Sequence, residues 1–591
     1  MTLANNMSRR SFMAVTGAGV AAPAVMAQGA HGGADPEADP EIVRLTSRSG
    51  VYTPARGKAV MQFSFDFPEP SVRVGGYLFS FRVQTFENAY AIDAQTVTVA
   101  RDGARTAVTV GGFLGDGGQT RVRGGLAAEF QTHPDGALEW RVKAEHGEDI
   151  KSVTTIIRGV PKGQFSVSAN EFFDSGDDER IFEYPYLFGG MTTPFIIVKS
   201  PDGSLTELSA RQTKVRPARF FFQPGPEDYR IEMIYEREGW KRSRRIESHL
   251  WRIAPVTSLE EAAAQHFGHV ERTYGAPAIE RRADAPPWVR ELGLVLSIHG
   301  AHWTGFVFNT YDQSLEILKW TSRQVDPRKT LVFLPAWDGR YYWNYPLYKA
   351  DRRMGGEEGL RRLIAEGQKL GFRMALMFGA NSVNKTLPEF SHMKDAVTEH
   401  VDGNAFDLDW VDWDNDRRNN GFSPFMNIAV DEWRSWLRDR ISDVIATYGP
   451  DAYFLDIAGA WVNNRKGDMY EGTGKLVADL RERHPGVVPI AEMVFDAQMA
   501  HFPLTQVTRY PVYPAGADRY VRTFQHLSRP APGRGSTGVH EAGFGDYSPD
   551  VAADQRAIPT LTIVDDTFTE HLDAMAAYIG QAKCWMAARG L

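Results

Sequence analysis

The sequence contains a single cysteine, Cys584, among 591 residues. One cysteine cannot form an intramolecular disulfide, and it excludes a zinc site built from several thiolates. The chain also lacks a basic excess, since 66 lysines and arginines face 74 aspartates and glutamates, for a formal net charge of −8. A general nucleic-acid-binding protein needs a basic surface that displaces counterions from phosphates, so we expect no nucleic-acid partner.

Several catalytic motifs are missing as well. The chain has no phosphate-binding loop, no dinucleotide-binding fingerprint and no Gly-x-Ser-x-Gly nucleophile elbow. No apolar run of about 20 residues follows the first part of the chain, so we expect no permanent membrane span. What is present is the composition of a globular protein with a large core, because 43% of the residues are hydrophobic and 12% are aromatic.

Residues 1–27 have the pattern of an export signal. Arg9 and Arg10 precede an apolar stretch at 14–24, and small residues after it predict cleavage before Gln28. The paired arginines resemble a twin-arginine signal, which exports proteins that have already folded. We therefore expect a periplasmic or secreted bacterial protein, and folding before export is consistent with the lack of disulfides.

Residues 40–255 alternate between polar and apolar side chains with the period of β-strands. The stretch 96–110 shows this most clearly, because two alternating runs flank the turn dipeptide Asp102-Gly103. Many such strands without helical periodicity between them predict an antiparallel β-sandwich as the first domain.

The pattern changes after a helical linker at 256–287, which opens with the capping box Ser258 and Glu261. From 288 to 591 short apolar runs alternate with amphipathic helices, which is typical of parallel β/α units. Eight strands over roughly 300 residues predict a (β/α)8 TIM barrel, with an open doubly wound sheet as the alternative. The predicted strands are Leu292–Ile298, Thr330–Leu334, Phe372–Phe378, Ala452–Leu455, Val487–Ala491, Gln506–Val512, Thr537–Glu541 and Thr560–Val564, and two predicted helices are Glu357–Leu370 and Val430–Tyr448.

Two carboxylates end neighbouring strands of this predicted barrel. Asp456 closes the fourth strand and Glu492 closes the fifth. Barrel enzymes carry their active sites at the carboxyl ends of the strands, and adjacent strands lie about 4.8 Å apart. Two such carboxyls can face one ligand at a separation of about 5 Å, which a retaining glycosidase uses. The alternative is a structural role in salt bridges or helix caps at the barrel rim.

A β-sandwich followed by a barrel, with Phe454-Leu455-Asp456 on the fourth strand and Ala491-Glu492 on the fifth, resembles retaining glycoside hydrolases. The arrangement is similar to that of the α-amylase-like and endo-α-N-acetylgalactosaminidase-like enzymes. The resemblance implies that Asp456 is the nucleophile and Glu492 the acid/base. Amylase-like enzymes have arginine two residues before the nucleophile, where this chain has Phe454. In the related α-galactosidase-like enzymes the acid is an aspartate on the sixth strand, so a proton donor on a later strand is the alternative to Glu492.

Aromatic and polar residues follow the other predicted strands. The loop after the second strand is dense in rings, which stack on the apolar faces of sugars while an acid binds their hydroxyls. The alternative is a hydrophobic loop packed on the barrel rim. The candidate substrate-binding residues are His299, His302, Trp337, Asp338, Tyr342, Trp343, Asn381, Trp461, His540 and Glu541.

We expect no cofactor, but two groups of residues are alternative metal sites. His299 and His302, with Asp338 or Asp456, could ligate zinc in a metal-dependent barrel hydrolase. The single-residue His-x-His spacing of such enzymes is absent. A carboxylate-rich loop could hold calcium, although it lacks the EF-hand pattern, and it carries Asp407, Asp409, Asp412, Asp414 and Asp416.

The sequence therefore predicts an exported glycoside hydrolase that cleaves an oligo- or polysaccharide with retention of configuration. Sugar identity, linkage, anomer, endo or exo action and oligomeric state are not encoded in these residues. Two other function classes stay open. One is a non-catalytic glycan-binding protein that uses the same aromatic loop, and the other is the metal-dependent hydrolase.

Overall fold

The structure, a computed structural model, describes most of the chain after the predicted export signal. Contacts place Ile42–Leu591 in one compact unit. Residues 1–27, predicted as the signal, lie outside the described residues. The described residues are 42–50, 52, 67–174, 176–185, 191–301, 305–339, 343–406, 423–492, 495–507, 516–525, 551 and 555–591.

The first half of this unit is built from antiparallel strands, as the alternating pattern predicts. The predicted hairpin is confirmed, since β5 and β6 pair in antiparallel register and Gly103 turns between them with a φ of +56°. The strands are β1 Ile42–Val43, β2 Ser71–Val74, β3 Tyr77–Thr85, β4 Ala89–Ile92, β5 Val97–Asp102, β6 Arg105–Gly115, β7 Thr120–Thr132, β8 Leu138–His146, β9 Ile150–Pro161, β10 Gln164–Val167, β11 Arg180–Tyr184, β12 Phe195–Lys199, β13 Leu205–Arg211, β14 Ala218–Pro224, β15 Asp228–Glu236, β16 Arg245–Glu247 and β17 Leu250–Val256.

These strands form two facing layers, which confirms the predicted β-sandwich. One layer runs β2-β3-β9-β15-β14-β11 and the other runs β5-β6-β7-β8-β17-β13-β12-β10. β4 pairs with β3 in one layer and with β6 in the other. Large rings fill the space between the layers. Phe79 packs edge-on against Trp140 at 5.2 Å between ring centroids, and Phe220 packs against Trp251 at 5.7 Å.

The second half is a parallel barrel, as predicted. Its eight strands pair in the order β24-β23-β22-β21-β20-β19-β18-β25. A parallel bridge between Phe524 of β24 and Ile558, just before β25, closes the ring. The strands are β18 Leu294–Ile298, β19 Thr330–Leu334, β20 Arg373–Gly379, β21 Ala452–Asp456, β22 Val488–Glu492, β23 Leu504–Val507, β24 Arg522–Gln525 and β25 Thr560–Ile563.

Two of the predicted barrel strands need correction. The sixth strand, β23, begins at Leu504 and so earlier than the predicted 506–512, of which residues 508–512 lie outside the described residues. The seventh strand is β24 and not 537–541, which lies outside the described residues. The apolar pattern does not predict β24 because this strand begins with Arg522. The Arg522 guanidinium donates to the main-chain carbonyls of Arg290 and Leu292.

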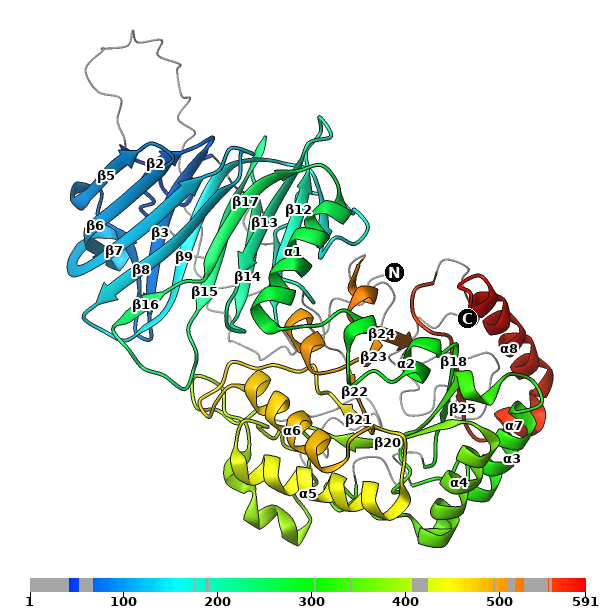
Figure 1. Cartoon of the computed structure of the whole chain (residues 1–591). Helices are drawn as coiled ribbons and strands as arrows, with labels where there is room; N and C mark the ends of the chain where they lie inside the picture. The colour runs from blue at the N-terminus through cyan, green and yellow to red at the C-terminus, as the bar shows by residue number, and fades with distance from the viewer. Residues whose placement is uncertain are drawn as a thin grey trace, which may run out of the picture. The chain divides into compact units, whose positions relative to one another are not determined.

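Helices α3 to α8 surround the parallel strands (Figure 1). The predicted helix at 430–448 is confirmed as α5, whose stripe of Trp433, Leu437 and Ile441 is buried. No described helix is long and apolar enough to cross a membrane. The helices are α1 Leu259–Tyr274, α2 Pro287–Glu291, α3 Tyr311–Thr321, α4 Gly356–Leu370, α5 Asp431–Tyr448, α6 Met469–Arg483, α7 Thr567–Glu570 and α8 Leu572–Ala587.

Helix α1 follows the last sandwich strand and contacts both halves of the unit. Ser258 caps it by accepting a hydrogen bond from the Glu261 N–H, as the capping box predicts. The helix packs on β13 and β17 and also on the short 3-10 helix η8, Asp496–Ala500, which follows β22. The boundaries predicted for the domains, at 255 and 287, stay predictions.

Candidate active site

The carboxyl ends of β21 and β22 bring Asp456 and Glu492 side by side. The two strands pair in parallel with Leu455 opposite Ala491, so the next residue of each strand is the carboxylate. Both side chains are buried, with Asp456 4% and Glu492 5% exposed. Because parallel strands end at the same rim, the two acids share one end of the barrel.

A hydrogen bond from a backbone N–H to a side chain links the two strand ends directly. The N–H of Ile457, the residue after Asp456, donates to Oε2 of Glu492 at 2.8 Å. Ile457 has a φ of +50°, which is costly for a β-branched residue. Strained backbone of this kind is held only where its surroundings fix it, and it gathers at functional sites. The backbone that follows Asp456 is therefore bonded directly to the Glu492 carboxylate.

The end of β20 adds a polar side chain on the other side of Asp456. The Ala380 N–H donates to the carbonyl of Asp456 at 3.2 Å, and Nδ2 of Asn381 donates to the carbonyl of Ile457 at 3.0 Å. Among the described residues, the buried Oδ1 of Asn381 has no hydrogen-bond partner. A buried acceptor without a partner is costly, so this atom is suited to a ligand that donates a hydrogen bond.

Asp338 supplies a second buried polar group, after the end of β19. Among the described residues its Oδ2 has no hydrogen-bond partner. Burial raises the pKa of Asp338 from 3.8 to about 8, and the nearby Asp351 carboxylate adds to the rise. Asp338 is therefore protonated at neutral pH and presents both a donor and an acceptor.

We expect the stability of the protein to depend on pH through Asp338. Folded Asp338 keeps a proton that the unfolded chain releases between about pH 4 and 8, so the contribution of Asp338 to the free energy of unfolding falls across this range as pH rises. The slope approaches about 1.4 kcal/mol per pH unit. Urea unfolding of the wild type and of Asp338→Asn should show this dependence in the difference between their free energies of unfolding.

A matched control for this experiment is Asp312→Asn, which changes an exposed aspartate. Its stability should follow the pH dependence of the wild type. Parallel curves for the wild type and Asp338→Asn would contradict the raised pKa.

The predicted aromatic residues divide into buried and exposed ones. The indole N–H of Trp337 donates to the Met377 carbonyl at 2.8 Å, and its ring packs against Phe378 and Tyr448. The indole of Trp461 is also buried and donates to Asp468 at 3.4 Å. Both rings therefore form part of the protein core.

Two rings are accessible at the loops that follow β18 and β19. Trp343 is 39% exposed, and Phe306 is 47% exposed. Phe306 was not singled out from the sequence because it lies in a short loop without a charged or repeated motif. His299, at the end of β18, is buried, and its Nε2 lies 3.3 Å from Oγ of Ser297.

Gln506 is a further polar residue that the sequence pattern did not identify. It lies on β23 directly opposite Glu492 in the parallel register and is buried. The sequence predicts it at the start of the sixth strand, but its register places it opposite the carboxyl end of β22. This position makes it a neighbour of Glu492.

Several predicted residues lie outside the described residues, namely His302, Tyr342, His540, Glu541 and the acidic loop from 407 to 416. Within the described part of the chain, no group of three or more histidine, cysteine, aspartate or glutamate side chains is arranged to hold a metal ion. The calcium and zinc alternatives therefore stay untested.

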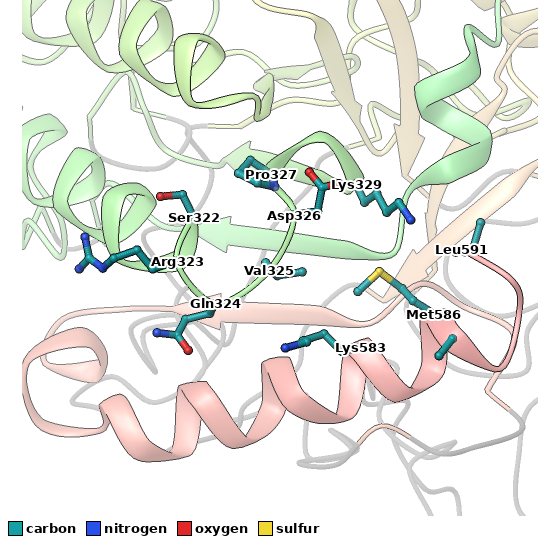
Figure 2. Close-up of a pocket in the computed structure, with 11 residues that line it drawn as sticks. Ser322, Arg323, Gln324, Val325, Asp326, Pro327, Lys329, Lys583, Met586 and Leu591 are labelled. Carbon is teal, nitrogen blue, oxygen red and sulfur yellow. The ribbon is translucent and has the colours of Figure 1, made fainter.

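A pocket of about 440 Å³ lies at the opposite end of the barrel. Its residues Ser322 to Lys329 directly precede β19, and the others come from the end of α8 and the chain terminus (Figure 2). The pocket is thus at the amino end of a barrel strand. Barrel chemistry occurs at the carboxyl ends, so this pocket is not part of the candidate site.

No protein-family model matches the chain, and no curated protein matches it. The chain is similar in structure to the α-N-acetylgalactosaminidase NagBb from Bifidobacterium bifidum in complex with GalNAc. The TM-score is 0.62 at 14% identity, covering 88% of this chain and 91% of that chain. A variant of the GH36 α-galactosidase AgaA from Geobacillus stearothermophilus, in complex with stachyose, gives a TM-score of 0.50 at 11% identity, covering 91% and 80%.

The complex of NagBb with Gal-NHAc-DNJ also matches, with a TM-score of 0.62 and 13% identity over 87% of this chain and 92% of that chain. At these identities the likeness establishes the fold. It confirms that the chain has the β-sandwich and TIM-barrel arrangement to which the sequence pointed.

Proposed function

We propose that the chain is a retaining glycoside hydrolase, with Asp456 as nucleophile and Glu492 as acid/base. The observation that carries this proposal is the pairing of the two buried carboxyls on the adjacent parallel strands β21 and β22. Retaining glycosidases need two carboxyl groups about 5 Å apart, and neighbouring strand ends supply this spacing.

The reaction proceeds in two steps through one covalent intermediate. A carboxylate oxygen of Asp456 attacks the anomeric carbon, the glycosidic C–O bond breaks, and protonated Glu492 gives its proton to the departing oxygen. Glu492, now a carboxylate, then takes a proton from a water molecule that attacks the same carbon. The ester to Asp456 breaks and releases the sugar with its original configuration. These steps use only carboxyl groups and water, so the proposal includes no cofactor.

The remaining polar groups fit the recognition of a sugar. Protonated Asp338 can donate to one hydroxyl and accept from another, and Oδ1 of Asn381 can accept from a third. His299, at the end of β18, would contact the same ring, and Trp343 would stack on a sugar face.

For the substrate class we propose an α-linked N-acetylgalactosamine or galactose at the reacting end. The similar structures are an α-N-acetylgalactosaminidase bound to GalNAc and an α-galactosidase bound to stachyose. These activities are those of the similar proteins. Because this chain shares their fold, their sugars are the first substrates to assay with it. Assays with the 4-nitrophenyl α-glycosides of the two sugars would decide between them. If the protein hydrolyses neither compound, this substrate class is refuted.

The retaining mechanism is tested by the configuration of the first product. Proton NMR during hydrolysis of an α-glycoside should show the α-anomer of the free sugar before mutarotation produces the β-anomer. Initial formation of the β-anomer would contradict a nucleophilic role for Asp456, since a single displacement inverts the anomeric carbon.

We also propose that the chain is exported as a folded protein through its Arg9-Arg10 signal. Cell fractionation of a bacterial host should find the mature protein outside the cytoplasm. Replacement of both arginines by lysine should retain it inside, and unchanged export of that variant would refute the twin-arginine route.

A further inference from the structure

The buried Asp496 lies in the segment that follows Glu492, where this segment meets α1 and the β-sandwich. Its Oδ1 accepts from the Tyr184 hydroxyl at 2.5 Å and from the Ala497 N–H at 2.8 Å. Its Oδ2 lies 2.6 Å from Nε2 of His266. Tyr184 ends the sandwich strand β11, and His266 lies on the buried face of α1. One carboxylate thus joins three separate elements.

Asp496 and Gln498 bond this segment to neighbours on two sides. The Asp496 N–H donates to the carbonyl of Thr192, in the connection between β11 and β12, at 2.9 Å. Nε2 of Gln498 donates to the carbonyl of Ala458 at 2.8 Å. Ala458 comes two residues after Asp456, so the segment also bonds to the one that follows the nucleophile.

The segment after Asp456 has its own bonds to the β-sandwich. Nδ2 of Asn463 donates to Oε1 of Glu236 at 2.8 Å, and Arg216 pairs with Asp468 at 2.8 Å. Glu236 ends β15, and Arg216 precedes β14. The chain after each of the two strand-end acids is therefore bonded to the sandwich.

The burial of the Asp496 carboxylate costs free energy unless its hydrogen bonds are kept. A buried carboxylate loses its hydration, and it is tolerated only when hydrogen bonds replace the lost water. Burial and the nearby Asp496 carboxylate raise the pKa of Tyr184 well above its usual range, so Tyr184 stays a neutral donor. Both oxygens of the buried Asp496 carboxylate have partners, and a carboxylate held in this way favours one arrangement of the elements that it joins.

We propose that Asp496 is a positioning residue for the reaction, which ties the Glu492 segment to Tyr184 and His266 and so aims the acid at the leaving-group oxygen. The inference rests on the proposed role of Glu492 as acid/base. In this arrangement the β-sandwich is part of the catalytic unit, because proton transfer is sensitive to small displacements of the donor.

The test compares substrates that need protonation with substrates that do not. Tyr184→Phe removes one bond to Asp496 and leaves the ring in place, and His266→Gln weakens the other side-chain bond. We expect each variant to lower kcat/KM about 10-fold or more on an unactivated disaccharide. On the matching glycosyl fluoride, whose leaving group needs little protonation, kcat/KM should stay within about twofold.

Tyr274→Phe is the matched control. It removes a hydroxyl that lies near Asp496 at the contact between α1 and the sandwich, but this hydroxyl donates to the Gln212 carbonyl and not to Asp496. Its kcat/KM on both substrates should match the wild type. Thermal unfolding of all variants checks that they are folded.

An equal loss on both substrates, or no loss in folded variants, would overturn the positioning role. The two proposals are distinguished by Glu492→Gln on the same substrates. If Glu492→Gln lowers kcat/KM mainly on the unactivated substrate, whereas Tyr184→Phe and His266→Gln do not, only the positioning role fails. If Glu492→Gln lowers kcat/KM equally on both substrates, the acid/base assignment fails, and the positioning role that rests on it fails with it.

Discussion

Asp456→Asn is expected to lower turnover on the order of 10⁴-fold with the protein still folded. The amide has nearly the shape of the carboxylate but cannot attack the anomeric carbon, so the covalent intermediate does not form. The strand end keeps two bonds that the substitution does not change, since the Ala380 N–H donates to the Asp456 carbonyl and the Ile457 N–H donates to the Glu492 carboxylate. The measurement is kcat on an aryl α-glycoside, with substrate binding followed by calorimetry.

Asp451→Asn is the matched control for this prediction. Asp451 directly precedes β21, at the opposite end of the strand from Asp456, and pairs with Arg373. The same substitution there should change stability but keep kcat within about twofold, because barrel chemistry occurs at the carboxyl ends. Near-normal turnover of Asp456→Asn would remove the nucleophile assignment.

Azide provides a second and independent measurement. In Asp456→Ala the space left by the side chain allows azide to attack the anomeric carbon of an activated substrate directly. The glycosidic bond breaks in the same step, and the product is a glycosyl azide of inverted configuration. A retained product would show that another group forms the covalent intermediate.

The barrel could be predicted because its strands are buried on both faces. Such strands read as short continuous apolar runs, and Thr330–Leu334 coincides with β19 for this reason. The apolar run is interrupted where a strand contains a polar residue that a distant segment bonds. At the start of β24, Arg522 donates to the carbonyls of Arg290 and Leu292. No local pattern reveals such a contact.

The strand-end rule also found the two acids, but it could not find what surrounds them. Asp496 bonds to Tyr184 and His266, which precede it by 312 and 230 residues in the sequence. Trp337 shows the same limit, since its position after a strand gave no sign that its indole bonds to Met377. Positions at strand ends follow from periodicity, whereas side-chain partners follow from the packing of distant segments.

Glu492→Gln is expected to lower kcat/KM about 10²- to 10⁴-fold on a substrate with a poor leaving group, and much less on a glycosyl fluoride. The amide cannot give a proton, so only substrates that depend on protonation are slowed in the first step. Glu482→Gln, an exposed residue of α6, is the matched control and should leave both substrates unaffected.

The configuration of azide products separates the two acids. In Glu492→Ala the nucleophile is intact, so an activated substrate still forms the ester to Asp456. Azide then attacks this intermediate from the side that Glu492 occupied, and the product is a glycosyl azide of retained configuration. The wild type should give no azide product, because the Glu492 carboxylate activates water and disfavours the anion. If Glu492→Ala gives only free sugar while a variant of an acid on a later strand gives the retained azide, the proton donor lies on that strand, and the neighbouring pair of β21 and β22 is not the catalytic pair.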